Sequence, residues 1–262
     1  MEHGLSTHHR RERTMLNNYD RIADLYDLYV TADYDLKFWE KECRDAGDVL
    51  EVTAGTGRVT LPLLRAGVRI TAVDVSLAQL KKLRDKAGEA GLEVETHRAD
   101  MRDFDLGRTF PTVIIPFQSL EELTEPCDVT AALRRVRAHL APEGRAIITL
   151  HNAAMQNGRE GQALQLVNEW ELKNGNRQLF WISRRYNPVS GIGKSYQLYE
   201  EYDVDGVLHK KRLFSPSYRV YQEADIRARI ESAGLRVTNA WGGYDHSPLG
   251  EESCYMIFEL RL

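Results

Sequence analysis

The stretch Val49-Leu-Glu-Val-Thr-Ala-Gly-Thr-Gly-Arg58 decides the fold of this chain. Its apolar residues up to Thr53 predict a buried β-strand, and the amphipathic run at 59–66 predicts a helix. Gly55 and Gly57 stand between the two, where the lack of a Cβ lets the backbone approach a bound ligand. The free N–H groups and partial positive charge of a helix N-terminus favour an anionic group there. The stretch therefore predicts a strand–turn–helix unit with a ligand at the turn.

The same alternation of apolar and amphipathic runs continues outward from this unit. It predicts further strands at 68–74, 92–97, 112–115, 145–150, 235–241 and 255–262. It also predicts a helix that is N-capped by Ser76, and helices at 129–140 and 222–233. Strands that alternate with helices indicate a parallel sheet covered on both faces. We expect a doubly wound, mostly parallel seven-stranded α/β fold of the Rossmann-like type, with a small antiparallel β subdomain inserted in it.

Aromatic-rich runs interrupt this pattern after Asn152. They predict antiparallel strands at 178–186, 195–202 and 207–213, the last two joined by a hairpin turn at Asp205-Gly206. We expect an inserted helix and small sheet over 153–217, which serves as a substrate cover or a dimer contact. The α/β core then comprises 48–152 and 218–262. A helical lid at 15–47 and a disordered tail at 1–14 precede it.

Three carboxylates support a binding site at one edge of the sheet. Glu51, Asp74 and Asp100 fall near the carboxyl ends of adjacent predicted strands, where this architecture binds ligands. An acid that ends the second strand, as Asp74 does, can accept hydrogen bonds from two ribose hydroxyls. Each acid alone could be a solvated loop charge, but the three together with the glycine turn indicate a nucleoside-containing ligand.

Composition excludes several functional classes. The formal net charge is −4, whereas proteins that grip a nucleic-acid backbone are more often basic. No apolar run approaches the roughly 20 residues of a membrane span, and the N-terminus lacks the apolar core of a signal peptide. The three cysteines share no metal-ligand spacing. We therefore expect a cytoplasmic protein without a metal, a membrane contact or a nucleic-acid partner.

The segment from Glu51 to Gly57 resembles the first motif of the class I S-adenosylmethionine-dependent methyltransferases, with Thr53 where glycine is commoner. The resemblance covers 48–150 and, more weakly, 222–262. It implies that the cofactor is S-adenosylmethionine, that Asp74 holds its ribose and that Asp100-Met101 lies against its adenine. The cofactor contacts that we expect on this basis are Tyr19, Tyr26, Glu51, Ala54, Gly55, Thr56, Gly57, Arg58, Asp74, Val75, Asp100, Met101 and Phe117.

Two further features bear on this resemblance. The segment 19–27 is similar to the lid that precedes the first motif in small-molecule N- and O-methyltransferases. The competing interpretation is a dinucleotide-dependent dehydrogenase. Its fingerprint requires a third glycine where this chain has Thr60, and it gives no reason for Glu51 or for Asp100. The methyltransferase interpretation is therefore favoured.

The class of methyl acceptor is reached by elimination. The segment 115–118 lacks the tetrad found in DNA amino-methyltransferases, and Glu121 and Glu122 are adjacent rather than well separated as in protein arginine methyltransferases. We expect transfer to nitrogen or oxygen of a small metabolite. The alternatives are a protein or RNA methyltransferase, or a cofactor-binding protein without transfer activity. We also expect the inserted sheet to serve as a homodimer contact if it does not cover the substrate.

In-line transfer from a sulfonium depends chiefly on orientation, which can supply on the order of 7–11 kcal/mol. A general base is needed only if the acceptor must lose a proton. His151 is the first choice for that base because it follows the fifth predicted strand on the ligand face; the alternative is a histidine that only bonds the insert. The residues that we expect to contact the acceptor are Tyr29, Gln118, Asn152, Tyr199, Arg219, Tyr221 and His246.

Overall fold

The computed structural model describes residues 17–156 and 161–262, so the expected tail at 1–14 lies outside the described residues. Seven strands form the main sheet: β1 (Asp48–Val52), β2 (Arg69–Asp74), β3 (Glu95–Arg98), β4 (Phe110–Ile115), β5 (Leu140–His151), β11 (Arg236–Trp241) and β12 (Tyr255–Arg261). Their spatial order is β11-β12-β5-β4-β1-β2-β3. The strands β1 to β5 pair in parallel, whereas β12 runs antiparallel to both β5 and β11. The predicted fold class is confirmed.

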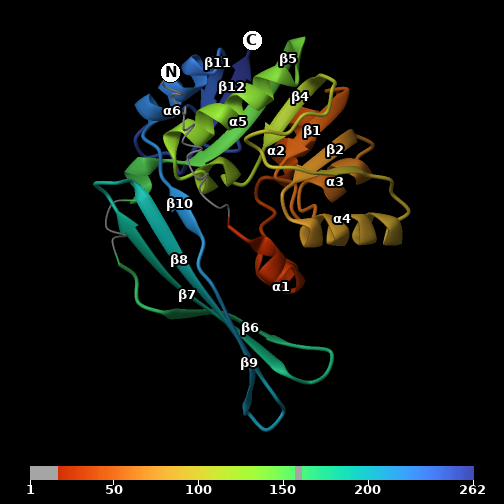
Figure 1. The fold of residues 1–262 in the computed structure, drawn as a ribbon, viewed down its shortest axis with the longest axis vertical. Coiled ribbons are helices and arrows are strands. Elements are labelled where there is room, and N and C mark those ends of the chain that lie inside the picture. The colour runs from red at the N-terminus through yellow and green to blue at the C-terminus, as the bar shows by residue number, and fades with distance from the viewer. Residues whose placement is uncertain (1–16, 157–160) are drawn as a thin grey trace, which may run out of the picture.

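Helices cover both faces of this sheet (Figure 1). They are α2 (Leu36–Cys43), α3 (Thr60–Arg65), α4 (Leu77–Glu89), α5 (Pro126–Ala138) and α6 (Glu223–Ser232). Successive strand residues point to opposite faces, so Ile115 packs with the α5 and α6 layer while Ile114 packs against α2 and α3. Ser76 caps α4 as predicted, because its Oγ accepts a hydrogen bond from the backbone N–H of Gln79.

The fifth strand begins at Leu140 rather than at residue 145, and two further predicted boundaries differ from the structure. The third strand begins at Glu95 rather than at Leu92, because Leu92 and Val94 pack against the apolar side of α4 instead. The helix expected at 129–140 begins at Pro126, a residue whose fixed φ and missing N–H suit the first turn of a helix. None of these differences moves the carboxyl ends of the central strands.

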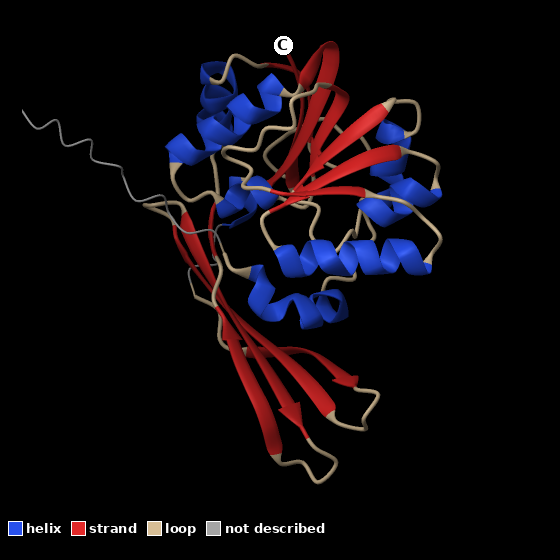
Figure 2. Ribbon diagram, turned by 45° about the vertical axis from the view of Figure 1, so that its right-hand side comes forward, coloured by secondary structure: helices blue, strands red, loops and turns tan. Residues whose placement is uncertain are grey.

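The inserted segment forms a second, antiparallel sheet that projects from the core as an arm (Figures 1 and 2). Its strands are β6 (Gln165–Glu171), β7 (Arg177–Asn187), β8 (Ile192–Tyr202), β9 (Leu208–Phe214) and β10 (Ser217–Arg219). The hairpin at Asp205-Gly206 is confirmed, with a left-handed φ of 78° at Gly206. The expected helix is not found at 161–217, and 153–156 forms only one short 3-10 turn. The segment that forms β6 is instead a strand paired with β7, and such pairing commonly overrides local propensity.

The N-terminal segment divides into two parts with different surroundings. The 3-10 turn η1 (Tyr19–Ile22) and α1 (Ala23–Tyr29) lie between the core and the arm (Figure 2), where Ile22 and Leu25 pack against Phe180 and Phe214. Helix α2 instead buries Trp39 and its neighbours against the main sheet. Only the first part of the expected lid at 15–47 is therefore placed as a lid, because the apolar face of α2 belongs to the core.

The membrane question has a simple structural answer. In the ranges 17–156 and 161–262, no helix is both long enough and apolar enough to cross a bilayer.

Candidate active site

A narrow pocket opens at the carboxyl edge of the central strands, where the strand order reverses between β1 and β4. This is the position at which open α/β sheets bind ligands. Its cavity volume is about 50 Å³, so the pocket is small in this structure. The residues that line it are Tyr19, Tyr26, Val52, Thr53, Gly55, Val73, Asp74, Val75, Gln79, Ala99, Met101, Ser119 and Glu122.

The glycine turn forms the floor of this pocket. Gly55 and Gly57 have φ values of 59° and 87°, which favour glycine, and a Cβ on Gly57 would lie 2.3 Å from Cδ1 of Leu83. Thr53 also has a positive φ, 67°, which explains why glycine is commoner at this place in the resembled motif. A β-branched residue in that conformation is strained, and such strain tends to gather at functional sites. The turn is therefore shaped for a close approach of a ligand.

Asp74 closes the pocket on the β2 side and is 8% exposed. Its Oδ1 accepts a hydrogen bond from the N–H of Ser76, and its Oδ2 accepts one from the N–H of Gly55, both at 2.8 Å. Burial raises the pKa of Asp74, and the backbone N–H groups of Ser76, Gly55 and Val75 oppose that rise. A carboxylate has about four acceptor sites, so Asp74 retains capacity for two hydroxyl donors.

Glu51 lies beneath the turn rather than in the pocket lining. It is 1% exposed, and Oγ1 of Thr60 donates a hydrogen bond of 2.5 Å to its Oε2. Burial raises the pKa of Glu51 to about 8. The hydroxyl of Thr60 thus supports the acid at the position where a dehydrogenase has its third glycine. Glu51 therefore positions the turn, and its side chain does not line the pocket.

The side chain of Arg58 is held by two other residues of the protein, Asp35 and Phe117. Its guanidinium makes a two-pronged ion pair with Asp35, at 2.5 and 2.7 Å, and Asp35 is fully buried. The same group lies 4.3 Å from the ring centroid of Phe117. Because α2 begins next to Asp35, the arginine joins the glycine turn both to the N-terminal segment and to the loop after β4. The structure places Arg58 and Phe117 beside the pocket and not in its lining.

The acid after β3 also has an internal partner. Arg102 bonds Asp100 through Nε and Nη2 and bonds Asp128 through Nη1 at 2.8 Å. The neighbouring Met101 and Ala99 do line the pocket and offer apolar surface for a flat ring. Of the expected pair Asp100-Met101, the structure therefore brings only Met101 to the pocket, because the arginine holds the acid to α5. Three other expected cofactor contacts, Ala54, Thr56 and Gly57, support the turn without lining the pocket.

The loop after β4 carries two consecutive residues in the left-handed region. Phe117 and Gln118 both have a φ of 57°. The N–H of Gln118 bonds Oγ1 of Thr149 at 3.1 Å, and its amide Nε2 donates to the hydroxyl of Tyr244 at 3.0 Å. Strain of this kind persists only where neighbouring structure imposes it, which again marks the edge of the pocket as a functional region.

The lid closes the pocket from above. Tyr19 and Tyr26 line it, with their ring centroids 5.8 Å apart in an edge-to-face arrangement. Asp20 bonds Oγ of Ser76 at 2.5 Å and the N–H of Ala78 at 3.0 Å, so η1 is tied to the start of α4. The lid is also tied to the glycine turn, because Oγ1 of Thr56 donates to Asp27. Two of the expected lid contacts, Tyr19 and Tyr26, thus reach the pocket.

His151, the expected base, lies outside the pocket lining. Its backbone N–H and its Nδ1 bond the two carboxylate oxygens of Glu121, at 2.6 and 2.9 Å. Its side chain is 42% exposed, and its ring lies 6.0 Å from that of Tyr255. Glu121 is buried, so it holds the imidazole at the outer rim of the β5 end. The structure gives this histidine an orienting carboxylate but does not bring it into the pocket.

Most of the expected acceptor contacts are placed elsewhere. Tyr199 is 2% exposed and stacks on Phe180, and Tyr29 packs on the same ring, because the arm uses its aromatic residues to bury the lid. Tyr221 is buried and donates to the carbonyl of Leu123. Arg219 donates to the carbonyls of Thr124 and Ser190, and Asn152 binds the loop before β12 through the carbonyl of Gly250. Gln118 alone remains at the pocket edge.

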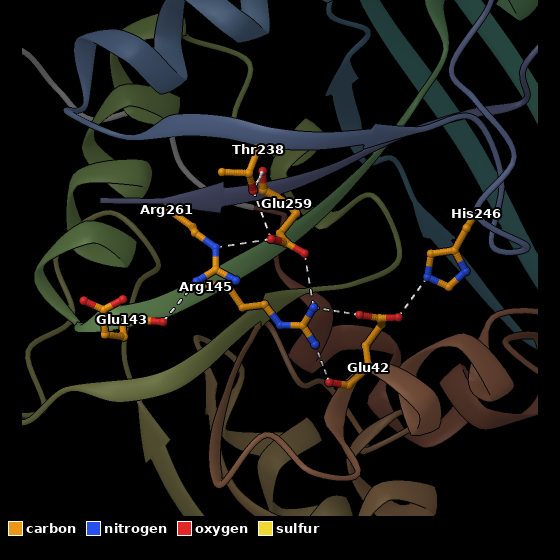
Figure 3. Close-up of polar contacts among 7 residues, drawn as sticks. All are labelled: Glu42, Glu143, Arg145, Thr238, His246, Glu259 and Arg261. Atoms are coloured by element: carbon orange, nitrogen blue, oxygen red, sulfur yellow. Dashed lines mark hydrogen bonds and ion pairs between the residues drawn. The ribbon is translucent and has the colours of Figure 1, made fainter.

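His246 is placed in a separate polar network on the α2 side of the sheet (Figure 3). Its Nε2 bonds Oε1 of Glu42 at 2.8 Å, and Oε2 of Glu42 pairs with Arg145 at 2.8 Å. Arg145 also pairs with Glu259, which accepts a hydrogen bond from Thr238. The ring of His246 packs on Trp241. The expected acceptor contact is therefore replaced by a structural one that connects the last loop to α2.

Sequence reasoning missed several lining residues: Val52, Thr53, Val73, Gln79, Ala99, Ser119 and Glu122. Gln79 is buried, and its Nε2 has no hydrogen-bond partner within the described chain. Its place in the first turn of α4, directly after the carboxyl end of β2, was a usable signal that it faces the same pocket. Glu122 carried no comparable signal, since its neighbour Glu121 is equally acidic and points to His151.

No metal site is found within the described ranges, where no group of three or more His, Cys, Asp and Glu side chains could hold an ion. The pocket is lined by the acidic side chains Asp74 and Glu122, which suit the hydroxyl groups of a sugar and a positively charged group. Asp74 offers acceptors, Gln79 offers an unsatisfied donor, and Met101 offers an apolar wall. This donor and acceptor set fits an adenosine-containing ligand.

Comparison with known proteins supports the same assignment. A family model described as a methyltransferase domain matches residues 49–144. The chain is 31% identical over 138 residues to a dTDP-3-amino-3,6-dideoxy-α-D-glucopyranose N,N-dimethyltransferase of Streptomyces fradiae, a match that covers 48% of this chain and only about half, 52%, of that relative. It is 24% identical over 252 residues to the cypemycin N-terminal methyltransferase of Streptomyces sp, covering 95% and 96% of the two chains.

Among solved structures, the CcbJ methyltransferase of Streptomyces caelestis superposes with a TM-score of 0.78 at 24% identity, covering 92% of this chain and 96% of that one. At this identity the superposition shows a shared fold, arm included. The matched domain covers the glycine turn, Asp74 and the loop after β4, the same elements that build the pocket. Residues 49–144 thus match a methyltransferase domain, and the chain has the fold of the solved methyltransferases to which it is similar.

Proposed function

We propose that this chain transfers a methyl group from S-adenosylmethionine to a nitrogen or oxygen atom of a small metabolite. The observation that carries the proposal is the single pocket in which the glycine turn, Asp74 and the two lid tyrosines meet. Curated relatives named as amino-sugar N,N-dimethyltransferases support a small polar acceptor, including one from Streptomyces venezuelae that is 28% identical over 84% of this chain.

The residues of the pocket have separable roles in this proposal. Asp74 accepts hydrogen bonds from the ribose hydroxyls, Gln79 donates one from its unsatisfied amide, and Met101 packs against the adenine. The turn at Gly55 receives the amino-acid end, and Tyr19 and Tyr26 exclude water from above. When bound, S-adenosylmethionine supplies a methyl group on a positively charged sulfur that is already a good leaving group. The protein's main contribution is then alignment and exclusion of water.

The base predicted from the sequence, His151, keeps a place in the proposal at the outer rim. Its contact with Glu121 gives the imidazole one orientation, as a carboxylate does for histidine in many catalytic pairs. An acceptor that extended from the pocket to the rim could transfer a proton there. Gln118, Phe117 and the exposed ring of Tyr34 would lie along such a path, from the β4 loop to the cluster of Tyr34, Tyr244 and Tyr255.

A peptide amine is a second acceptor class with specific support. The relative named as a cypemycin N-terminal methyltransferase matches nearly the whole of both chains. An RNA acceptor has no comparable support, and the net charge of −4 does not favour one. A cofactor-binding protein without transfer activity would show tight binding and no turnover with any amine or hydroxyl compound.

Calorimetry on the purified chain tests the cofactor assignment. We expect S-adenosylmethionine and its demethylated product S-adenosylhomocysteine to bind, and NAD to give no heat, because the pocket lacks the glycine that packs a dinucleotide-binding helix against its strand. Binding should survive EDTA, since no described cluster can hold a metal. Binding of NAD in place of S-adenosylmethionine would contradict the proposed function.

The proposal extends to a homodimer formed through the arm. Leu166 and Val167 on β6 and Leu208 and Leu213 on β9 are between 45% and 53% exposed, which is a large apolar surface for strands that project into solvent. Pairing of two arms would cover it. Light scattering should then give about twice the 30.0 kDa of one chain, and a mass of one chain would contradict the dimer.

A cytoplasmic location is also part of the proposal. Cys43, Cys127 and Cys254 are all free thiols, which suits a reducing compartment.

A further inference from the structure

Glu122 is an acidic side chain in the pocket with two fixed hydrogen bonds. It ends the 3-10 turn η2 (Ser119–Glu122), which follows β4, and it lines the pocket together with Tyr19. The hydroxyl of Tyr19 donates to its Oε1 at 2.8 Å, and Nδ2 of Asn17 donates to its Oε2 at 3.2 Å. Both oxygens are therefore held in one orientation by the segment that forms the lid.

No cation balances this carboxylate within the described chain. The charged or titratable groups that act on it are Tyr19 and Asp74, and the groups on which it acts in turn are the hydroxyls of Tyr26 and Tyr29. Burial in the pocket raises the pKa of Glu122 to about 7. The hydrogen bonds from Tyr19 and Asn17 oppose this rise, and repulsion from Asp74 adds to it.

The nearest elements do not supply a cation either. Arg219 of β10, which packs against η2, donates to the carbonyls of Thr124 and Ser190. On the β5 side, His151 is paired with Glu121. Arg58, beside the glycine turn, is paired with Asp35. A carboxylate removed from water without a cationic partner is costly, even with two hydrogen bonds, so this arrangement favours a ligand that brings a positive charge.

We propose that Glu122 receives the ammonium group of an amine acceptor and takes its proton, which assigns the acceptor to amines rather than to hydroxyl compounds. This inference rests on the proposed function and narrows it. Glu122 is better placed for this role than His151, because it lines the pocket while the histidine lies outside the lining on the rim.

The step balances with the groups already named. A proton passes from the acceptor ammonium to a carboxylate oxygen of Glu122, and the N–H electron pair stays on nitrogen. That pair forms the new N–C bond while the C–S bond breaks and its electrons remain on sulfur. The product leaves as a methylated ammonium, and Glu122 returns its proton to solvent.

Sinefungin tests the assignment without knowledge of the natural acceptor. In this cofactor analogue an amine-bearing carbon replaces the methylated sulfur, so a protonated amine stands at the place of transfer. Binding of sinefungin and of uncharged S-adenosylhomocysteine is measured by calorimetry for wild type and Glu122→Gln. We expect sinefungin to bind the variant about 30-fold or more weakly, and S-adenosylhomocysteine to change by less than about threefold.

The pH dependence supplies a second readout. A cation stabilises the ionised form of Glu122, so sinefungin affinity should be full above pH 7 and fall as pH drops through the pKa of about 7. The limiting slope is about tenfold per pH unit. Glu122→Gln should abolish this slope, and Glu122→Asp should retain part of it. A purely structural role for Glu122 would not move this profile.

Glu125→Gln is the matched control, because Glu125 is an exposed carboxylate on the same loop with no side-chain capping bond. It should leave both affinities unchanged. Equal losses of sinefungin and S-adenosylhomocysteine in Glu122→Gln would overturn the assignment and place Glu122 at the amino-acid end of the cofactor. A pH slope that persists in Glu122→Gln and disappears in His151→Gln would overturn it in favour of the histidine. Failure of wild type to bind S-adenosylhomocysteine or S-adenosylmethionine would instead overturn the proposed function, and this assignment with it.

Discussion

Replacement of Asp74 by alanine is expected to weaken S-adenosylmethionine binding by about 30- to 1000-fold, or roughly 2–4 kcal/mol. The carboxylate can accept from both ribose hydroxyls, and hydrogen bonds to a charged group are the stronger kind. The same side chain also receives the N–H groups of Gly55 and Ser76, so its loss loosens the floor of the pocket as well. Asp74→Asn should be milder, because its amide oxygen still accepts.

A double-mutant cycle separates the two contributions. The dissociation constant is measured for S-adenosylhomocysteine and for an analogue without the 2′- and 3′-hydroxyls, in wild type and in Asp74→Ala. If Asp74 holds the ribose, removal of the hydroxyls should weaken binding in wild type and have little further effect in the variant. Asp85→Ala is the control, since Asp85 is an exposed acid on α4 whose partner is Lys81. A change below threefold in Asp74→Ala would show that this acid does not hold the cofactor.

Replacement of Arg58 by methionine is expected to lower the free energy of unfolding by about 3–5 kcal/mol. The variant keeps most of the apolar stem but leaves the carboxylate of Asp35 fully buried, with Trp39 Nε1 as its remaining side-chain donor. An unpaired charge in the interior costs far more than the pair contributes. The contact with the ring of Phe117 is also lost, so the loop after β4 should loosen.

Urea denaturation of three variants checks this expectation. Arg69→Met is the matched control, because Arg69 makes a similar contact with Asp48 on the surface, where both side chains are more than half exposed. Its removal should cost under about 1 kcal/mol. The double variant Asp35→Asn with Arg58→Met removes the buried charge and should recover much of the loss. Equal effects of Arg58→Met and Arg69→Met would show that burial of Asp35 is unimportant for stability.

The sequence by itself determined the layers of this protein and the place of its pocket. The glycine turn, the apolar period of the strands and the position of Asp74 are local features, and each depends on backbone rules that act over a few residues. The order of the elements then leaves little choice, because parallel strands joined by helices meet the ligand at their carboxyl edge. For this reason the chain pattern alone predicts Gly55 and Asp74 at the pocket, whereas Met101, Tyr19 and Tyr26 are predicted only by the resemblance to the methyltransferase family.

Only the tertiary structure decided which polar side chains face that pocket. His151, Asn152 and Tyr199 carry suitable chemistry, yet each is bound to a residue distant in the sequence or buried in the arm. An inserted helix was expected within 153–217 without a stated position, and strand β6 was not predicted, because its pairing with β7 is a long-range contact that local propensity does not report. Glu121 and Glu122 are adjacent and identical in type, but their side chains reach different partners, His151 at the rim and Tyr19 in the lid. Which of the two enters the pocket depends on the turn after β4 and on the lid above it. No local sequence pattern specifies the contact between that turn and the lid.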